Sequence, residues 1–342
     1  MTRGRCLSRL VSAAVVVGLV ATGCTSPGKG PPAGGMSSEA RAYLRGALDH
    51  LEDTALVGDE VDWPSVRSEA FRTAADARTP ADTHAAILKA VRSLGDGHSY
   101  FYTPAEAEEI TAASGAVAGG NVEGRALPGG IGYLDVRGAR GDARALDAFV
   151  GSGRAAVAAA DRGGACGWIV DLRENQGGNM WPMLTVLGPI LGEGRAGSFV
   201  GADGKAVPFL IRDGAPHRGK DTWPWAPPAP VTRDHPPVAV LTGPWTASSG
   251  EAVAIAFRGR PATRTFGSPT RGIPTGIAPR ELPDGAVLGV AQSRIADRTG
   301  RSYEGPLQPD EEVPVVREDT GTGDDRALTT AARWLERQPG CR

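Results

Sequence analysis

Apolar residues recur every three or four positions between residues 37 and 102, a spacing typical of amphipathic helices. Three stretches of this segment also begin with helix-capping signals. Serines and a glutamate open the first, Asp62 with Pro64 in the first turn opens the second, and "TPADTHAAILKAVRSL" repeats both signals. The pattern predicts an N-terminal helical subdomain over 37–102.

Beyond residue 130 the pattern changes to short apolar runs that alternate with helical periodicity, typical of strands followed by helices. The strand-like runs are "GIGYLDVRG", "GWIVDLR", "VAVLTG" and "VLGVAQSRIADRTG". This alternation predicts an α/β core over 130–318, with a mostly parallel central sheet and right-handed crossovers. We interpret residues 103–129 as a flap or linker, 200–235 as an insertion in the core, and 319–342 as a C-terminal helix and tail.

The first 23 residues have the pattern of a secretion signal, because Arg3, Arg5 and Arg9 precede the apolar run "LVSAAVVVGLVATG". This run is shorter than the roughly 20 residues that span a bilayer. It ends at Cys24 in "VATGC", which resembles a bacterial lipobox and implies lipidation of Cys24. Residues 24–36 then form a flexible Pro/Gly/Ser tether. We expect a protein anchored by lipid to the extracytoplasmic face of the cell membrane, or partly released from it.

Composition, charge and cysteine content further limit the classes of function that the chain can have. The 342 residues carry a formal net charge of −2 and 41% hydrophobic content, which indicates a globular protein. No basic stripe is present, and this argues against a nucleic-acid partner. Behind Cys24 only Cys166 and Cys341 remain, and they form either a disulfide in an oxidising compartment or two separate small residues. The sequence does not give the oligomeric state.

The turn "TASSGE" lies between a strand-like and a helix-like run, at the carboxyl edge of the predicted sheet, where α/β proteins hold reacting groups. A serine exposed there can act as a nucleophile, with the next amide facing a developing oxyanion. The alternative is that Thr246, Ser248 and Ser249 only cap the helix, with Glu251 completing a capping box from Ser248.

A serine nucleophile needs a base, and His98 in the Gly-rich loop "LGDGHSYF" is the candidate. The alternative is a solvated surface histidine. None of the four lysines follows the serine turn. The histidines lack metal-ligand spacing and no HExxH occurs, so we expect neither a metal nor an organic cofactor.

Six strings resemble, in order and approximate spacing, the S41 peptidases, a family that includes the C-terminal processing proteases, the tricorn core and the nisin resistance protein. The resemblance covers about residues 85–316 and implies an S41-type core of the ClpP/crotonase-like kind. The lipobox, the helical N-terminal part and the "TASS" turn look most like the nisin-resistance branch. The strings are "LGDGHSYF", "GIGYLDVRG", "GWIVDLRENQGGNMWPM", "TASSGE", "FGSPTRGIPTG" and "YEGPLQPDEEV".

This resemblance implies roles for individual residues. Ser248 matches the family nucleophile, and the amide of Ser249 would supply one oxyanion donor. In "DLRENQGG", Gly177 or Gly178 would supply the other, and a residue without Cβ lets the backbone approach a substrate carbonyl closely.

The departures from the family pattern select the base. Ile273 stands where the processing proteases have their catalytic lysine, and Arg271 cannot replace it because arginine does not deprotonate in proteins. The resemblance therefore makes His98 the general base. Glu304 matches the acid that orients the histidine in tricorn-like members. Asp96 is the runner-up, although it is better suited to fixing its own loop.

Two functions follow from this sequence. The first is an extracytoplasmic serine endopeptidase that hydrolyses peptides or unfolded protein segments. The alternative is a catalytically silent relative that binds peptides as a lipoprotein. An esterase or amidase is disfavoured, because the G-x-S-x-G elbow is absent around Ser248. The interval between Phe101 and Gly130 is too short for a PDZ domain, and Trp223 and Trp225 either line a substrate path or pack internally.

Overall fold

The computed structural model describes residues 35–116 and 122–341. The chain divides into the unit Met1–Gly35 and the compact unit Met36–Arg342, and the second unit holds the described helices and strands. The predicted signal, Cys24 and nearly all of the tether lie outside the described residues. Within the described part, no helix combines the length and apolar character that a bilayer crossing requires.

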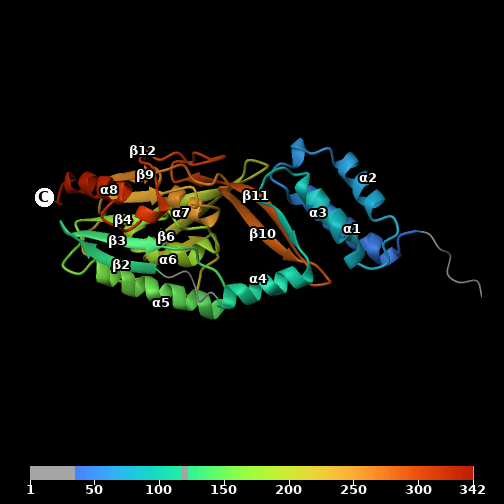
Figure 1. Cartoon of the computed structure of the whole chain (residues 1–342), viewed down its shortest axis with the longest axis horizontal. Coiled ribbons are helices and arrows are strands. Elements are labelled where there is room, and N and C mark those ends of the chain that lie inside the picture. Colours follow the sequence, from blue (N-terminus) through green and yellow to red (C-terminus); the bar gives the residue numbers. More distant parts are fainter. Residues whose placement is uncertain (1–34, 117–121, 342) are drawn as a thin grey trace, which may run out of the picture. The chain divides into compact units, whose positions relative to one another are not determined.

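The N-terminal segment folds into helices, as the apolar spacing predicts (Figure 1). Two predicted caps are present: the Ser37 side chain accepts from the amide of Ala40, and Asp62 accepts from Ser65. Leu44, Leu48 and Ile87 share a buried cluster with residues of strand β11 (Val287–Asp297). The elements are α1 (Ser38–Thr54), η1 (Gly58–Glu60), α2 (Trp63–Thr73), η2 (Ala81–Thr83) and α3 (His84–Arg92).

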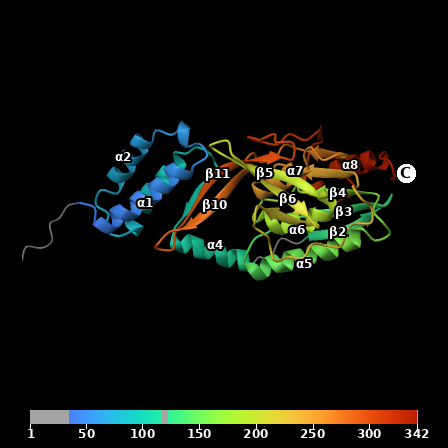
Figure 2. The same ribbon diagram turned by 180° about the vertical axis from the view of Figure 1, so that it is seen from behind.

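The first of two sheets, sheet A, is antiparallel throughout, and the sequence did not predict it. Its order is β1-β11-β5-β6-β7, and β10 also pairs with β11. Figure 2 shows β10 and β11 side by side, next to α1. The strands are β1 (Tyr100–Tyr102), β5 (Gly194–Gly201), β6 (Ala206–Arg212), β7 (Ala215–Arg218), β10 (Thr275–Glu281) and β11 (Val287–Asp297).

The second sheet, sheet B, is mixed, in the order β12-β9-β8-β4-β3-β2. Its pairings are parallel except for β2 with β3. The predicted α/β class is therefore confirmed, whereas one mostly parallel sheet is too simple a description of the core. The strands are β2 (Val122–Leu127), β3 (Ile131–Val136), β4 (Gly167–Asp171), β8 (Val238–Thr242), β9 (Thr263–Gly267) and β12 (Glu311–Glu312).

Both faces of sheet B are buried, which explains the continuous apolar runs in β4 and β8. Leu134 and Val170 face a cluster with side chains of α5, α6 and α7, while Tyr133 and Ile169 on the other face meet Leu335 of α8. Figure 1 shows α5 along β2 and β3. These helices are α5 (Ala143–Ala160), α6 (Met180–Leu191), α7 (Ser249–Phe257) and α8 (Arg326–Glu336).

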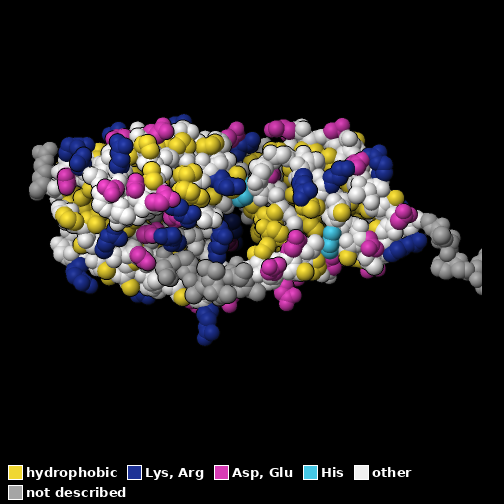
Figure 3. Space-filling view, in the orientation of Figure 1, with side chains coloured by type: hydrophobic (Ala, Val, Ile, Leu, Met, Phe, Trp, Pro, Cys, Tyr) yellow, Lys and Arg dark blue, Asp and Glu magenta, His cyan; other side chains and the backbone are white. Residues whose placement is uncertain are grey.

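The stretches predicted as irregular contain regular elements. The interval 103–129 holds α4 (Pro104–Ala116) and the edge strand β2, and the insertion 200–235 holds β6 and β7. A third 3₁₀ turn, η3 (Arg317–Asp319), precedes the C-terminal helix. Over the face in Figure 3, basic and acidic side chains are interspersed.

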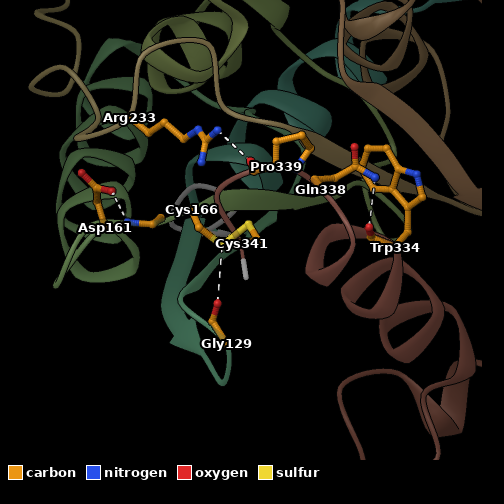
Figure 4. The surroundings of a disulfide bond; sticks show 9 residues. Gly129, Asp161, Cys166, Arg233, Trp334, Gln338, Pro339 and Cys341 are labelled. Atoms are coloured by element: carbon orange, nitrogen blue, oxygen red, sulfur yellow. Dashed lines mark hydrogen bonds between the residues drawn. A yellow bond between two sulfur atoms is a disulfide. The ribbon is translucent and has the colours of Figure 1, made fainter.

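Cys166 and Cys341 form a disulfide with Cα atoms 5.0 Å apart, which settles the alternative that the sequence left open. Figure 4 shows the bond beside Gly129, with Arg233 donating to the carbonyl of Pro339 at 2.8 Å. The bond ties the segment behind α8 to the residue that precedes β4.

Candidate active site

Ser248 lies in the short turn between β8 and α7. Its φ is +52° and its ψ is −120°, a conformation that non-glycine residues rarely adopt and that is strained. A residue that only caps a helix normally has an extended backbone. A strained strand-to-helix turn of this kind is how α/β hydrolases expose a nucleophilic serine.

The buried carboxylate of Glu251 holds this turn in place. It accepts from the amide of Ser248 at 2.9 Å, from the amides of Gly272 and Ile273 at 2.8 and 3.0 Å, and from the hydroxyl of Thr270 at 2.5 Å. Burial raises the pKa of Glu251, while these hydrogen bonds act to lower it. The predicted capping contact of Glu251 with Ser248 is therefore present, and the same carboxylate also fixes the segment 270–273.

Gly177 and Gly178 form the turn that follows β4, with φ of +88° and +122°. A Cβ on Gly177 would lie 2.9 Å from the Cβ of Ser248, and one on Gly178 would lie 2.1 Å from the carbonyl oxygen of Ala139. Only glycine fits either position. The hydroxyl of Ser249 donates to the carbonyl of Gly178 at 2.5 Å and joins the two turns.

The hydrogen bonds distinguish between the two glycines as oxyanion donors. The amide of Gly177 already donates to Oδ1 of Asn175 at 3.0 Å. Within the described residues, no hydrogen bond uses the amides of Gly178 or Ser249. Two amides on adjoining turns are therefore free to donate to a carbonyl oxygen that gains negative charge.

His98 lies in the loop after α3, and Asp96 fixes that loop. Oδ1 of Asp96 accepts from the amides of His98 and Ser99 at 2.9 and 2.8 Å. Nδ1 of His98 lies 2.6 Å from Oγ1 of Thr275, at the start of β10. Burial lowers the pKa of His98, although Asp96 opposes the shift. If Nδ1 donates to Thr275, Nε2 keeps the lone pair that a general base needs.

Ser248 and His98 both attach to the segment that leads into β10. Glu251 joins the amide of Ser248 to that of Ile273, and two residues later Thr275 contacts His98. Glu304 lies elsewhere: its side chain is 72% exposed and pairs with Nε of Arg294 at 2.5 Å. Among the described residues, Thr275 and not Glu304 is the group within hydrogen-bond distance of Nδ1 of His98.

Sequence reasoning missed the supporting contacts of three residues. Thr275 gave no signal, because a threonine at a strand end is ordinary. Asn175 stands inside the motif "DLRENQGG", where its buried amide also donates to the carbonyl of Val136 at 3.0 Å. Thr246 donates to the carbonyl of Leu172 at 2.8 Å and ties the serine turn to the end of β4.

The tryptophans near the site are packed together. Trp181, at the start of α6 behind the glycine turn, stacks on Trp223 with ring centroids 3.7 Å apart. Nε1 of Trp225 donates to Asp147 at 2.7 Å. The loop of the 200–235 insertion therefore lies against α6, the helix that begins close to Gly178.

Comparison with known proteins assigns the core of the chain to a family. Residues 130–313 match peptidase family S41, which is more than half of the chain. The nisin-resistance protein of Lactococcus lactis subsp. lactis is 25% identical over 300 residues, which cover 86% of this chain and 87% of that protein.

Two solved structures share the fold. A lipoprotein from Streptococcus agalactiae has a TM-score of 0.72 and 23% identity, covering 88% of this chain and 97% of that one. A photosystem II D1 C-terminal processing protease has a TM-score of 0.57 and 14% identity, covering 81% and 94%.

Together with the match to peptidase family S41, the α/β core and the serine turn define a serine peptidase-like protein. The chain belongs to peptidase family S41.

Proposed function

We propose that the protein is a serine endopeptidase, with Ser248 as nucleophile and His98 as general base, that hydrolyses peptides or unfolded protein segments. The observation that carries this proposal is the strained Ser248 turn, packed against a glycine turn and flanked by two free amides. A helix cap requires neither the strain nor the second turn.

The reaction follows from the groups present. Nε2 of His98 removes the proton of the Ser248 hydroxyl as its oxygen attacks the peptide carbonyl carbon. The amides of Gly178 and Ser249 stabilise the negative charge on the carbonyl oxygen. His98 then gives the proton to the leaving nitrogen as the C–N bond breaks, leaving an ester on Ser248. His98 then removes a proton from water as the water oxygen attacks this ester, and returns it to Oγ of Ser248 as the C–O bond breaks and the acid leaves.

Thr275 takes the role of orienting group in this proposal. A hydroxyl that accepts from Nδ1 fixes the ring and its tautomer, and it stabilises the imidazolium formed during attack. The ion pair of Glu304 with Arg294 and the loop contacts of Asp96 leave neither carboxylate on Nδ1.

The location is also part of the proposal. The secretion signal and the lipobox at Cys24 support lipid anchoring at the extracytoplasmic face. The structural similarity to a streptococcal lipoprotein agrees with that placement. A disulfide joining Cys166 to Cys341 suits an oxidising compartment.

The test compares the full-length protein with Ser248→Ala, in a mixed peptide library that contains nisin, with products identified by mass spectrometry. Ser152→Ala on α5 is the matched control. Hydrolysis by the native protein and the control, but not by Ser248→Ala, is the expected result. Peptides retained on the native protein without products would instead identify a silent peptide-binding lipoprotein.

A further inference from the structure

One edge of strand β10 has no partner among the described strands. Within the described residues this strand pairs only with β11, where Ile277 lies opposite Ala291. The main-chain groups of Ala291 point away from β10: its N–H donates to Oγ of Ser99 at 3.0 Å and its carbonyl accepts from Leu56 at 2.8 Å. In an antiparallel ladder, Ile277 must then also direct its N–H and C=O outward, to the free edge of β10.

The alternation along the strand agrees with this assignment. Pro279 and Glu281 follow Ile277 at intervals of two, so their main-chain groups face the same edge. Proline has no N–H to offer a partner strand and is tolerated at such an edge. The edge thus offers the N–H and C=O groups of Ile277 and Glu281 and the C=O of Pro279, a template for an extended peptide.

A cavity of about 490 Å³ adjoins the same strand. Phe199, Val207 and Ile277 form apolar parts of its wall, and the exposed Ala278 lies on its lining. Sites that hold small ligands have volumes of about 300–1,000 Å³, so one large side chain fits.

The basic side chains that line this cavity, Lys205 and Arg218, each form an ion pair. Lys205 pairs with Asp203 at 2.7 Å, and Arg218 pairs with Asp221 at 2.7 Å. The cavity therefore has no unpaired charge on Lys205 or Arg218 to recruit an anion, and its walls favour an apolar side chain.

The cavity is connected to both halves of the candidate active site. Gly276 on its lining directly follows Thr275, the partner of His98. The ring of Phe199 lies 6.1 Å from that of Trp181, which begins α6 behind the oxyanion turn. A peptide on the free edge of β10 would therefore pass the cavity one residue from Thr275, the partner of His98.

Resting on the proposed peptidase function, we propose that the substrate binds as an added strand along the free edge of β10 and inserts a bulky apolar side chain into this cavity. Side chains of an added strand alternate between faces, so one of every two neighbouring residues faces the cavity. The substrate class is extended peptide with a Phe- or Leu-like residue close to the scissile bond.

The first test fills the cavity with Ala278→Trp. Ala206→Trp, which adds the same ring to an exposed position of β6 outside the cavity lining and away from the edge of β10, is the control. In a peptide series with Phe, Leu, Ala or Gly near the cut, the native protein and the control should prefer Phe and Leu by about tenfold over Ala. Ala278→Trp should lose that preference and keep its rate on the Ala peptide. An unchanged preference in Ala278→Trp overturns the proposal.

A second test needs no change at β10 and no catalysis. Binding of a labelled Phe-containing peptide to Ser248→Ala is measured by fluorescence anisotropy, with single N-methyl groups placed along the peptide backbone. Loss of affinity at every second amide supports strand addition, and a flat profile contradicts it. Because binding is read in Ser248→Ala, failure of the native protein to hydrolyse any peptide would refute the proposed function and still leave this test decisive.

Discussion

Oγ1 of Thr275 lies 2.6 Å from Nδ1 of His98, although 177 residues separate them in the chain. Under the proposed mechanism, Thr275 takes the role that a carboxylate has in the triad of serine hydrolases. A hydroxyl is uncharged, so it orients the ring without adding a buried negative charge. Burial consequently dominates the pKa of His98 and lowers it.

Replacing Thr275 tests its role directly. Thr275→Val should lower kcat by about 10- to 100-fold, because a hydrogen bond to a charged group contributes about 1.5–3 kcal/mol. Thr275→Ser keeps the hydroxyl and should restore most of the rate. Glu304→Gln should stay within a few-fold of the native protein, because its carboxylate pairs with Arg294 at the surface. The assignment is wrong if Glu304→Gln loses more activity than Thr275→Val.

The low pKa of His98 predicts the pH dependence of the reaction. The neutral imidazole is the active base, and activity falls as the ring protonates on acidification. Because burial lowers the pKa of His98, its neutral form persists at pH values below the ordinary histidine pKa of about 6.5. The acid limb of kcat/KM should therefore have its midpoint below about 6.5. A midpoint well above that ordinary value would contradict a buried neutral base at this position.

The glycine turn proposed as part of the oxyanion site should not tolerate a side chain. Gly178→Ala would place Cβ against the carbonyl of Ala139, displace the amide and lower kcat by about 10²- to 10³-fold. Gly163→Ala is the control, since its φ is also positive, at +92°, but nothing lies within 4 Å of an added Cβ. Both variants carry backbone strain, and only the first should lose turnover among correctly folded molecules. Equal losses of turnover would remove Gly178 from the oxyanion site.

The disulfide should stabilise the fold without taking part in catalysis. It joins cysteines 175 residues apart, and removal of such a bond typically costs about 2–4 kcal/mol. We expect Cys166→Ser to lower Tm and leave kcat unchanged in the folded protein. A reductant should lower Tm of the native protein and not that of the variant. A reductant that leaves the native Tm unchanged would show that this bond carries no stability.

Local signals in the sequence were sufficient for some features. The caps at Ser37 and Asp62 follow from neighbouring residues, and the structure contains both. The glycine turn was implicated by the family resemblance, and the structure places Gly177 against Ser248.

The features that the sequence did not predict depend on contacts between residues that lie far apart in the chain. Strand β10, "TGIAPRE", is mostly exposed at the edge of its sheet, and it lacks the apolar alternation that predicts strands. Because the sequence did not predict this strand, it did not indicate that Thr275, at the start of the strand, contacts His98. The match of Glu304 to the family pattern could not reveal that Arg294 holds its carboxylate.

The central claim, that Ser248 is an activated nucleophile, is tested most directly by reaction with a fluorophosphonate followed by peptide mapping. The account predicts one phosphonyl group per molecule on Ser248, none on Ser249, and little reaction in His98→Ala. Labelling of Ser249 in place of Ser248, or no reaction in a protein that hydrolyses peptides, would contradict it.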